Sequence, residues 1–362
     1  MTERDPRLAP DSFCVLDEAQ ATDRAEWLRL WTAWAEREPM AHPAYVALFA
    51  RPGDRAVCLA LRGEGSGVLF PLLLRPLAVE PWAAPGENRW DAVSPYGYGG
   101  PFAWGAVPND AFWDAAEHWL RAAGVVTAFA RLSLFSQELI PFRGDVVDNM
   151  PNVVRRLDLD GEALWRDYAH KVRKNVNAAR RAGLSFEIDP GGRRLDDFIA
   201  IYESTLDRRN AGDGFYFSRE FFETILREMP SSCVFAHVLD GGRVVSTELV
   251  LRSATRLYSF LGGTLADAFE KRPNDLLKHE VGEWGRAAGL RAYVLGGGYG
   301  GPDGIFRYKL SFAPSGEVPF RVGLSILDAG GNAALIETRR VFQMSRGNQW
   351  SPRPGFFPIY RA

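Results

Sequence analysis

The alternation of hydrophobic and polar positions predicts an α/β chain in which one run of elements occurs twice. Residues 56–74 and 234–252 each contain two β-rich apolar runs around a glycine turn, which is the pattern of a β-hairpin. The elements expected after each hairpin are a further strand at 91–100 and 256–264, a helix at 108–125 and 273–290, and an apolar strand at 126–135 and 291–298. The order strand, strand, strand, helix, strand is therefore repeated.

The two expected helices carry the clearest sign of duplication. PNDAFWDAAEHWLRAAGV at 108–125 aligns without gaps to PNDLLKHEVGEWGRAAGL at 273–290, and eight of the 18 positions are identical. The residues suited to the helix ends are paired between the copies: Asn109 or Asp110 with Asn274 or Asp275 as N-caps, and Gly124 with Gly289 at the C-terminus. Helix signals alone produce part of this agreement, but the matching flanks favour duplication over chance.

The length of the chain agrees with two domains. A chain of 362 residues exceeds what one ordinary core supports, because single cores stop growing near about 250–300 residues. We expect domains at 1–150 and 151–362, with the boundary in the polar stretch 145–155 that Pro151 interrupts. The repeated order resembles the GNAT fold, which implies an α/β protein of two tandem GNAT-like domains, each a mixed, mostly antiparallel sheet flanked by helices.

Composition and charge exclude several classes of protein. Hydrophobic residues make up 46% of the chain and charged residues 24%, which excludes global disorder. Lys and Arg number 43 against 45 Asp and Glu, which leaves a formal charge of -2. No global field therefore draws the chain onto nucleic acid or anionic lipid, and a polyanion must be bound locally.

Targeting and metal-binding signals are weak. The three cysteines are widely spaced without a CxxC pair, the start of the chain lacks a signal-peptide pattern, and no apolar run approaches the ~20 residues that span a bilayer. We therefore expect a soluble cytoplasmic protein with no integral membrane segment. The histidines are scattered, with no HExxH motif, so we expect no metal site.

The basic segment KVRKNVNAARRAGL resembles a motif of the Fem-type peptidyltransferase family. The matching residues, in the order K-x-R-x-N-x-x-x-A-x-x-x-G, are Lys171, Arg173, Asn175, Ala179 and Gly183. That family has two GNAT-like domains and transfers amino acids from aminoacyl-tRNA to peptidoglycan precursors. The resemblance covers roughly 155–320 and is shared with a broad set of bacterial GNAT-family acyltransferases. No charged heptad segment suggests the helical-hairpin arm that several Fem proteins insert.

A second match follows a glycine-rich run at 296–301. GGGYGGPDGIFRYKLSFAPSGE resembles the late segment of the family through Tyr308, Lys309 and Phe312. The resemblance implies that Lys309 is catalytic, its ammonium stabilising the reacting acyl group, and that Tyr308 helps to bind substrate. We expect Lys309 in a polar gap of the strand-like run FRYKLSF; the alternative is a solvated lysine pointing outward from an edge strand. No GK[ST] follows the glycines, so we expect them to let backbone pass close to a substrate or to the other domain.

Five further residues of the second half are candidates for binding substrate. Lys171 and Arg173 lie in the basic segment, which suits nucleotide phosphates or the acceptor end of tRNA, although a solvated helix surface explains it equally well. Arg208 and Arg209 precede the loop NAGDG and Tyr216, and this segment resembles the part of the family that grips a nucleotide-linked acceptor. The alternative for either arginine is an ordinary salt bridge.

In the first half, SPYGYGGP at 94–101 offers Tyr96 and Tyr98 as substrate-binding residues that line an interdomain cleft. A glycine-rich turn packed by aromatic side chains is the alternative. The first half lacks a counterpart of the basic segment and of Lys309, which suggests a supporting role.

The sequence leaves two possible donors of the acyl group. A conventional acetyl-CoA enzyme of this fold needs a Q/R-x-x-G-x-G/A loop before the central helix, and neither copy has one. We therefore expect no tightly bound cofactor and an aminoacyl-tRNA donor, acting on an amine of a cell-envelope precursor or small metabolite. The alternatives are an acyl-CoA-dependent N-acyltransferase of polysaccharide or secondary-metabolite biosynthesis, and a non-catalytic precursor-binding module.

Overall fold

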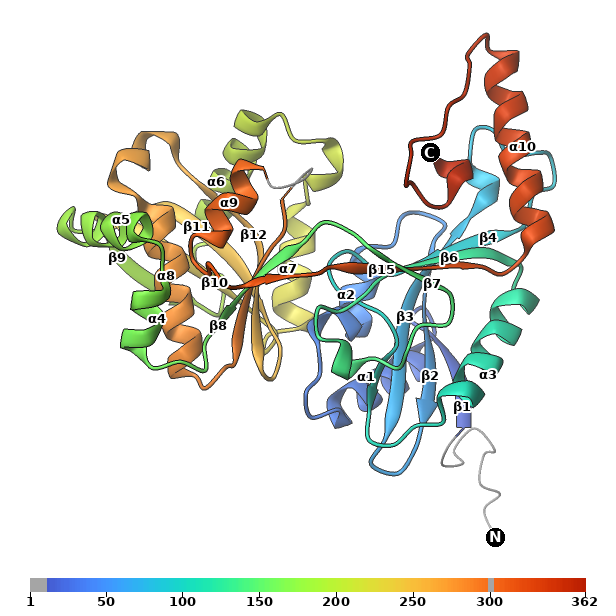
Figure 1. Ribbon diagram of the computed structural model, residues 1–362, viewed down its shortest axis with the longest axis horizontal. Coiled ribbons are helices and arrows are strands. Elements are labelled where there is room, and N and C mark those ends of the chain that lie inside the picture. Colours follow the sequence, from blue (N-terminus) through green and yellow to red (C-terminus); the bar gives the residue numbers. More distant parts are fainter. Residues whose placement is uncertain (1–11, 299–302) are drawn as a thin grey trace. The chain divides into compact units, whose positions relative to one another are not determined.

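The computed structural model describes residues 12–298 and 303–362, which form two compact units (Figure 1). The first unit contains the described residues up to Ala35, together with Met40–Asn149 and Phe320–Ala362. The second unit contains Glu36–Pro39 and Met150–Pro319. Each unit is built around one sheet with helices on both faces.

The sheet of the first unit is mixed and mostly antiparallel. In spatial order its strands are β1 (Ser12–Asp17), β2 (Arg55–Arg62), β3 (Gly67–Pro76), β4 (Trp90–Val93), β6 (Val125–Arg131), β15 (Arg321–Ile326) and β7 (Asp145–Asp148), with β5 (Phe102–Trp104) paired to β3. The pair of β4 and β6 is parallel, and the other strand pairs are antiparallel. Strand β2 is apolar at consecutive positions because both of its faces are covered.

Aromatic side chains on the helices form the core of the first unit. The helices are α1 (Ala21–Ala33), α2 (Pro43–Leu48), α3 (Asn109–Ala122) and α10 (Ala329–Ser345). Helix α3 packs Phe112 and Trp113 against one face of the sheet, and α1 packs Trp27 and Trp31 against the other. Among the described residues, no helix is both long enough and apolar enough to cross a membrane.

The second unit repeats this architecture. In spatial order its strands are β14 (Glu317–Val318), β8 (Asn152–Arg156), β13 (Ala292–Gly296), β12 (Arg256–Thr264), β11 (Arg243–Arg252), β10 (Cys233–Asp240) and β9 (Ser185–Asp189). Only β12 and β13 are parallel among the described strand pairs of this unit. The strands β2, β3, β4 and β6 and helix α3 thus recur as β10, β11, β12, β13 and α8, which confirms the expected fold class and the repeated order.

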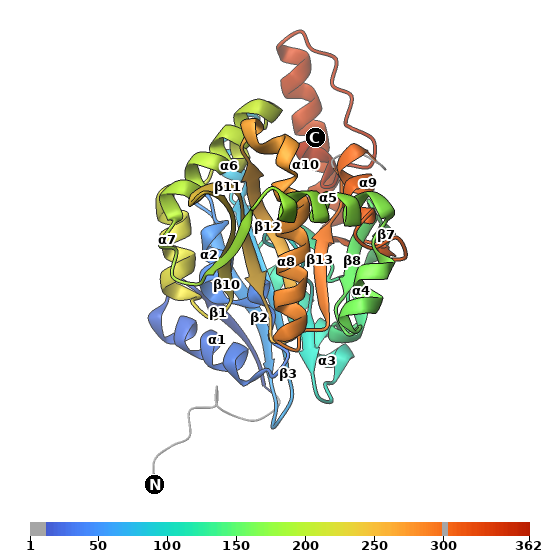
Figure 2. The same cartoon turned by 90° about the vertical axis from the view of Figure 1, so that its left-hand side faces the viewer.

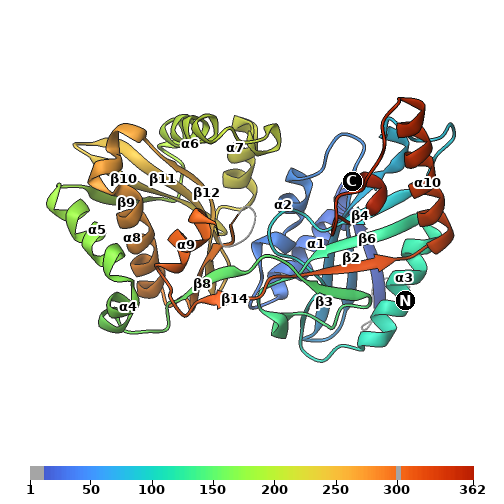
Figure 3. The same ribbon diagram turned by 45° about the horizontal axis from the view of Figure 1, so that its top comes forward.

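Helices cover both faces of the second sheet as well. The helices are α4 (Gly161–Asp167), α5 (His170–Arg181), α6 (Leu195–Arg209), α7 (Arg219–Glu228), α8 (Pro273–Ala287) and α9 (Gly304–Leu310). Helices α4, α5 and α8 lie on one face of the sheet, where α5 contributes Val172 and Val176 to the core (Figure 2). Helices α6 and α7 lie on the other face, where Phe198 packs edge-to-face on Phe222 and Phe235 (Figure 3).

The ends of the repeated helices follow the prediction at one terminus only. Helix α3 begins at Asn109 and α8 at Pro273, so the expected capping residues lie inside the helices. The N-cap residues are Pro108 and Arg272, and neither side chain caps its helix. The expectation of Asn or Asp caps is therefore wrong. At the other end, Gly124 and Gly289 have φ of +75° and +74°, the left-handed conformation that ends a helix at glycine.

The expected extent of the second domain, 151–362, is wrong at its C-terminal end. Strand β15 pairs with β6 and β7 of the first sheet, so the chain returns to the first unit after Pro319. The same place beside β13 in the second sheet is filled by β8. Without β15, the backbone groups along one side of β6 would lack partners, and hydrophobic patterning does not say which of two similar sheets a strand completes.

A short segment within 1–150 also belongs to the second unit. The carboxylate of Glu38 accepts hydrogen bonds from Arg256 Nη1 at 2.7 Å and from Tyr258 Oη at 2.6 Å, and all three side chains are buried. A buried carboxylate requires such partners, because an unpaired charge is costly away from water.

Candidate active site

The parallel strands of the second sheet separate toward their C-terminal ends. Their register runs from Arg256 opposite Ala292 to Tyr258 opposite Val294. Strand β12 then continues to Thr264, where β11 pairs with it on its other side. Within the described residues, the edge of β12 beyond Tyr258 therefore has no parallel neighbour. We call the place where the two strands part the opening between β12 and β13.

The segment that carries Lys309 is a helix, which corrects the expected strand-like conformation of FRYKLSF. Helix α9 begins after Asp303, whose carboxylate accepts a hydrogen bond from Phe306 N at 2.7 Å. Phe306 and Leu310 are four residues apart and both pack into the core of the second unit. The alternating pattern resembles a strand, but the N-cap and this apolar pair stabilise a short helix.

Lys309 is partly buried at the opening between β12 and β13. Its Nζ donates a hydrogen bond to the carbonyl oxygen of Gly297 at 2.7 Å, directly after β13. Burial and, after it, the positive charge of Lys278 lower the pKa of Lys309 to about 8, while the negative charges of Glu248 and Asp303 oppose this shift. The side chain is thus a largely protonated ammonium at neutral pH, rather than a solvated lysine on an edge strand.

A buried polar cluster lies beside Lys309, formed by Glu248, Ser259, Lys278 and Tyr293. Lys278 Nζ on α8 donates to Glu248 Oε1 at 2.5 Å and to Ser259 Oγ at 2.7 Å. Tyr293 Oη on β13 donates to Glu248 Oε2 at 2.7 Å. Because one member comes from each of β11, β12, β13 and α8, the cluster fixes these elements around the opening.

The sequence analysis missed this cluster, although two signals in the sequence point to it. Lys278 occupies the repeat position that holds Trp113 in the first copy, and Trp113 is buried. Glu248 interrupts the apolar run of β11. A charged residue at a position that the repeat predicts to be buried requires a partner of opposite charge.

Tyr308 lies next to Lys309 and contacts the start of α8. Asn274 Nδ2 donates to Tyr308 Oη at 2.8 Å. Burial holds the pKa of Tyr308 well above its usual value, and the negative charges of Asp275 and Glu248 add to this effect. Tyr308 is therefore a neutral phenol that retains its proton for hydrogen bonding.

Part of the chain matches a known protein family. Residues 166–310 match the family model described as an acetyltransferase (GNAT) domain. This stretch spans the strands and helices that carry Lys309 and its cluster, and the first unit repeats its strand order. The chain has a tandem GNAT fold.

Solved structures share this fold at low sequence identity. A structure titled FemX aligns with a TM-score of 0.60 and 13% identity over 84% of this chain and 94% of that one. The C-terminal domain of a putative lysylphosphatidylglycerol synthetase from Agrobacterium fabrum aligns with a TM-score of 0.55 and 17% identity, covering 86% and 95%. The structure of L-PGS from Bacillus licheniformis aligns with a TM-score of 0.54 and 14% identity, covering 90% and 98%. None of the curated proteins matches the sequence.

Two predicted binding residues of the GNAT domain lie on α5. Lys171 is exposed. Burial raises the pKa of the nearby Asp275 carboxyl, and the positive charge of Lys171 is among the effects that oppose this shift. Arg173 Nη1 donates to the carbonyl oxygens of Arg166 and Tyr168. Arg173 thus joins α4 to α5, and a role for either residue in binding substrate stays a prediction.

The other predicted binding residues of the GNAT domain lie at the C-terminal end of α6 and just beyond it. Arg208 donates to the carbonyl oxygen of Thr264, the last residue of β12, at 3.1 Å. Arg209 is exposed, and Tyr216 Oη donates to Asp207 Oδ1 at 2.7 Å. Within the described ranges, neither arginine forms the ordinary salt bridge that the sequence left open. The structure therefore brings Arg208 to the C-terminal end of β12.

The glycine-rich run after β13 is described only in part. A Cβ on Gly297 would lie 3.0 Å from the carbonyl oxygen of Pro151, which belongs to the same unit. A close approach of these glycines to a substrate or to the other domain stays a prediction. Gly300 and Gly301, which belong to the same run, lie outside the described residues.

Tyr96 and Tyr98 belong to the first unit. The carbonyl oxygen of Tyr96 accepts a hydrogen bond from Tyr45 Oη at 2.9 Å, and its side chain is 43% exposed. The ring of Tyr98 packs edge-to-face on Phe320 at 5.7 Å. These contacts agree with a glycine-rich turn packed by aromatic residues, and the cleft that they were expected to line stays a prediction.

Proposed function

We propose that the protein is an acyltransferase that forms an amide on an amine acceptor, with its transfer site at the opening between β12 and β13. The observation that carries the proposal is the partly buried ammonium of Lys309, held against Gly297 beside the Glu248 and Lys278 pair. The GNAT family match over 166–310 supports the same class of reaction.

The reaction requires little covalent chemistry from the protein. The neutral amine of the acceptor attacks the carbonyl carbon of the donor, and the C=O electron pair moves to oxygen, giving a tetrahedral oxyanion. A fixed ammonium such as Lys309 stabilises that charge more in the transition state than in the ground state. Collapse re-forms C=O and breaks the bond to the donor's leaving group, an alcohol oxygen of tRNA or the sulfur of CoA. The proton that the amine loses passes to this group, which leaves as an alcohol or a thiol.

Aminoacyl-tRNA is the donor that we favour. The segment before α8 is the 3-10 helix η6 (Ala266–Lys271), and Arg272 at the N-cap has φ of +60°. A pyrophosphate at a helix N-terminus needs a glycine-rich approach of free backbone N–H groups, which this segment does not resemble. The names of the structural neighbours fit aminoacyl transfer, but what they share with this chain is the fold.

For the acceptor we favour an amine of a cell-envelope precursor or small metabolite. Arg208 at the end of β12, with Arg209 and Tyr216 nearby in the chain, supplies cations and an aromatic ring for a phosphorylated acceptor. Lys171 and Arg173 on α5 remain candidates for the tRNA acceptor end.

The deciding experiment offers the full chain total tRNA charged with labelled amino acids, with acetyl-CoA and longer acyl-CoAs in parallel. We expect discharge of one amino acid, lost in Lys309→Ala and retained in Lys271→Ala. Lys271 is a suitable control because it is exposed and pairs with Asp240 on the surface, where ion pairs contribute little. Transfer from CoA thioesters alone would identify the runner-up N-acyltransferase. A precursor that binds tightly but is never modified would identify a binding module.

A further inference from the structure

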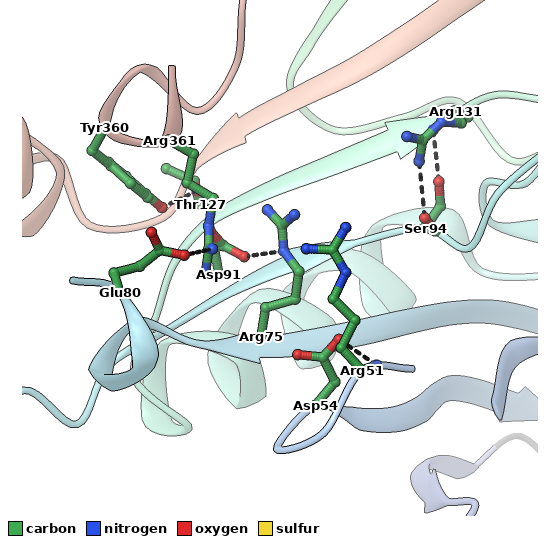
Figure 4. Close-up of polar contacts among 10 residues, drawn as sticks. All are labelled: Arg51, Asp54, Arg75, Glu80, Asp91, Ser94, Thr127, Arg131, Tyr360 and Arg361. Carbon is green, nitrogen blue, oxygen red and sulfur yellow. Dashed lines mark hydrogen bonds and ion pairs between the residues drawn. The ribbon is translucent and has the colours of Figure 1, made fainter. Parts of the chain in front are cut away.

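A row of polar side chains crosses three strands of the first unit's sheet. Arg75 on β3 lies opposite Asp91 on β4, and Asp91 lies opposite Thr127 on β6. Arg131 is four residues beyond Thr127 on the same strand. Because side chains alternate between the two faces of a strand, Arg131 shares the face of the other three (Figure 4).

Two further arginines reach this face from outside the sheet (Figure 4). Arg51 comes from the turn between α2 and β2, and its side chain is exposed. Arg361 comes from the 3-10 helix η7 (Ile359–Arg361), which Tyr360 holds in place through a hydrogen bond between its Oη and Thr127 Oγ1 at 2.6 Å. Four guanidinium groups therefore gather on one side of the first unit.

Two buried or partly buried carboxylates neutralise part of this charge. Asp91 is fully buried and accepts hydrogen bonds from Arg75 Nε at 2.6 Å and from Arg361 Nε. Arg361 also pairs with Glu80. Arg75 and Arg361 are thus balanced by Asp91 and Glu80.

Asp54 is the third carboxylate of the group. It accepts a hydrogen bond from the backbone N of Arg51 at 2.9 Å. Burial raises the pKa of Asp54, although the positive charges of Arg75, Arg51 and Arg361 oppose the shift. Four guanidinium groups therefore face three carboxylates. Arg51 contacts Asp54 through its backbone, so its guanidinium and that of Arg131 are the two that lack an ion pair among the described residues.

Arg131 is partly buried and, within the described part of the chain, makes no ion pair. Its Nη1 donates to the carbonyl oxygen of Ser94 at 3.1 Å, and its guanidinium lies 5.2 Å from the centre of the Phe129 ring. Burial lowers the pKa of Arg131, and the positive charge of Arg75 contributes in the same direction. A guanidinium carries five N–H donors, so a carbonyl and a ring leave most of its hydrogen-bonding capacity for another group.

We propose that this face of the first unit binds a phosphoryl group of a small-molecule ligand, held by Arg131, Arg75 and Arg51. An anion bound there neutralises the excess positive charge of the guanidinium groups. It also reduces the repulsion between Arg131 and Arg75. A phosphoryl group fits better than a single carboxylate, because it offers more acceptor oxygens and up to two negative charges to several planar donors. The site concerns the first unit alone and does not depend on acyl transfer at Lys309.

The test is a titration of inorganic pyrophosphate into the full chain at low ionic strength, followed by calorimetry, with succinate titrated in parallel. We expect saturable binding of pyrophosphate that Arg131→Gln weakens about tenfold or more, as expected for the loss of charge-assisted hydrogen bonds. Arg51→Gln should weaken it less, because that side chain is exposed. Arg340→Gln on α10 is the matched control, an exposed arginine paired with Glu337, and should leave the affinity unchanged.

Thermal unfolding of the same variants separates ligand binding from a structural role. In anion-free buffer, Arg131→Gln should melt no lower than the wild type, because it removes a repelled cation. At the same concentration, pyrophosphate should raise the Tm of the wild type more than that of the variant. The proposal is overturned if the wild type does not bind pyrophosphate, if Arg131→Gln binds it equally well, or if succinate binds as tightly as pyrophosphate.

Discussion

At the scale of single residues, two lysines of the second unit have different surroundings. Lys278 pairs with the Glu248 carboxylate, whereas Lys309 donates to the neutral carbonyl of Gly297. Burial, together with the charge of Lys278, brings the pKa of Lys309 to about 8. This value keeps the ammonium charged at neutral pH and makes it sensitive to mild alkali.

The first prediction concerns the pH dependence of transfer. If the ammonium of Lys309 is required, kcat should fall as pH rises through about 8, because the proton is lost there rather than near 10.5. In Lys309→Arg, any residual activity should lack this descending limb, since a guanidinium does not titrate in that range. The measurement is a pH–rate profile at saturating substrates. A wild-type rate that stays level to pH 10 would contradict the assignment.

The second prediction concerns the Glu248 and Lys278 pair. Lys278→Met should destabilise the second unit by about 3–5 kcal/mol, because it leaves a carboxylate that is 2% exposed without its cation. The double variant Lys278→Met with Glu248→Leu should recover most of that loss, since apolar replacement of both partners is often near neutral. Urea denaturation of the single and double variants measures both effects. Equal loss in the single and double variants would show that the pair is not what stabilises the unit.

At the scale of elements, helix α8 shows how packing selects residues that helix propensity disfavours. Gly282 and Gly285 lie within this helix, although glycine is among the weakest helix formers. A Cβ on Gly285 would come within 2.6 Å of Leu257 and 2.9 Å of Leu157. A Cβ on Gly282 would make only ordinary contacts, at 3.8 Å from Leu157 and Tyr168.

The third prediction uses these two glycines as a matched pair. Gly285→Ala should destabilise the second unit by about 1–3 kcal/mol, because it forces α8 away from β12 in a well-packed core. Gly282→Ala should instead stabilise it by up to about 1 kcal/mol through helix propensity. Chemical denaturation of the two variants under the same conditions compares them directly. The packing explanation fails if both substitutions shift stability in the same direction.

At the scale of the whole molecule, the first unit depends on a strand that follows the second unit in the chain. Strand β15 follows the second unit in the chain but completes the sheet of the first, with Leu324 opposite Phe129 on one side and Asp145 on the other. A strand thus belongs to the unit whose sheet it completes, whatever its position in the chain.

The fourth prediction tests this assignment of β15. Leu324→Pro removes a backbone N–H from a strand with neighbours on both sides, which should cost about 3 kcal/mol or more. Hydrogen exchange should then show lost protection in β6 and β7 of the first unit and unchanged protection in β12 and β13 of the second. Lost protection confined to the second unit would instead support the continuous domain 151–362 expected from the sequence.

From the sequence, only those site residues could be predicted that lie in a recognisable motif. The family resemblance pointed to Lys309 and Tyr308. Lys309 lies at the opening between β12 and β13 and Tyr308 contacts the start of α8, and their roles in transfer stay predictions. Glu248 and Lys278 were missed because they are 30 positions apart and meet only when β11 and α8 pack together. The helical conformation around Lys309 was also missed, since a seven-residue run satisfies both a strand and a helix pattern.

The sequence by itself determined the repeated order of strands and helices, the α/β class and the glycine ends of α3 and α8. These are local properties, set by side-chain periodicity and by the left-handed conformation that glycine allows. Only the tertiary structure decided which sheet β15 completes, the polar cluster beside Lys309 and the arginine-rich face of the first unit. Those depend on contacts between segments remote in the chain, because strand pairing and charge compensation are settled by the neighbours that folding brings together.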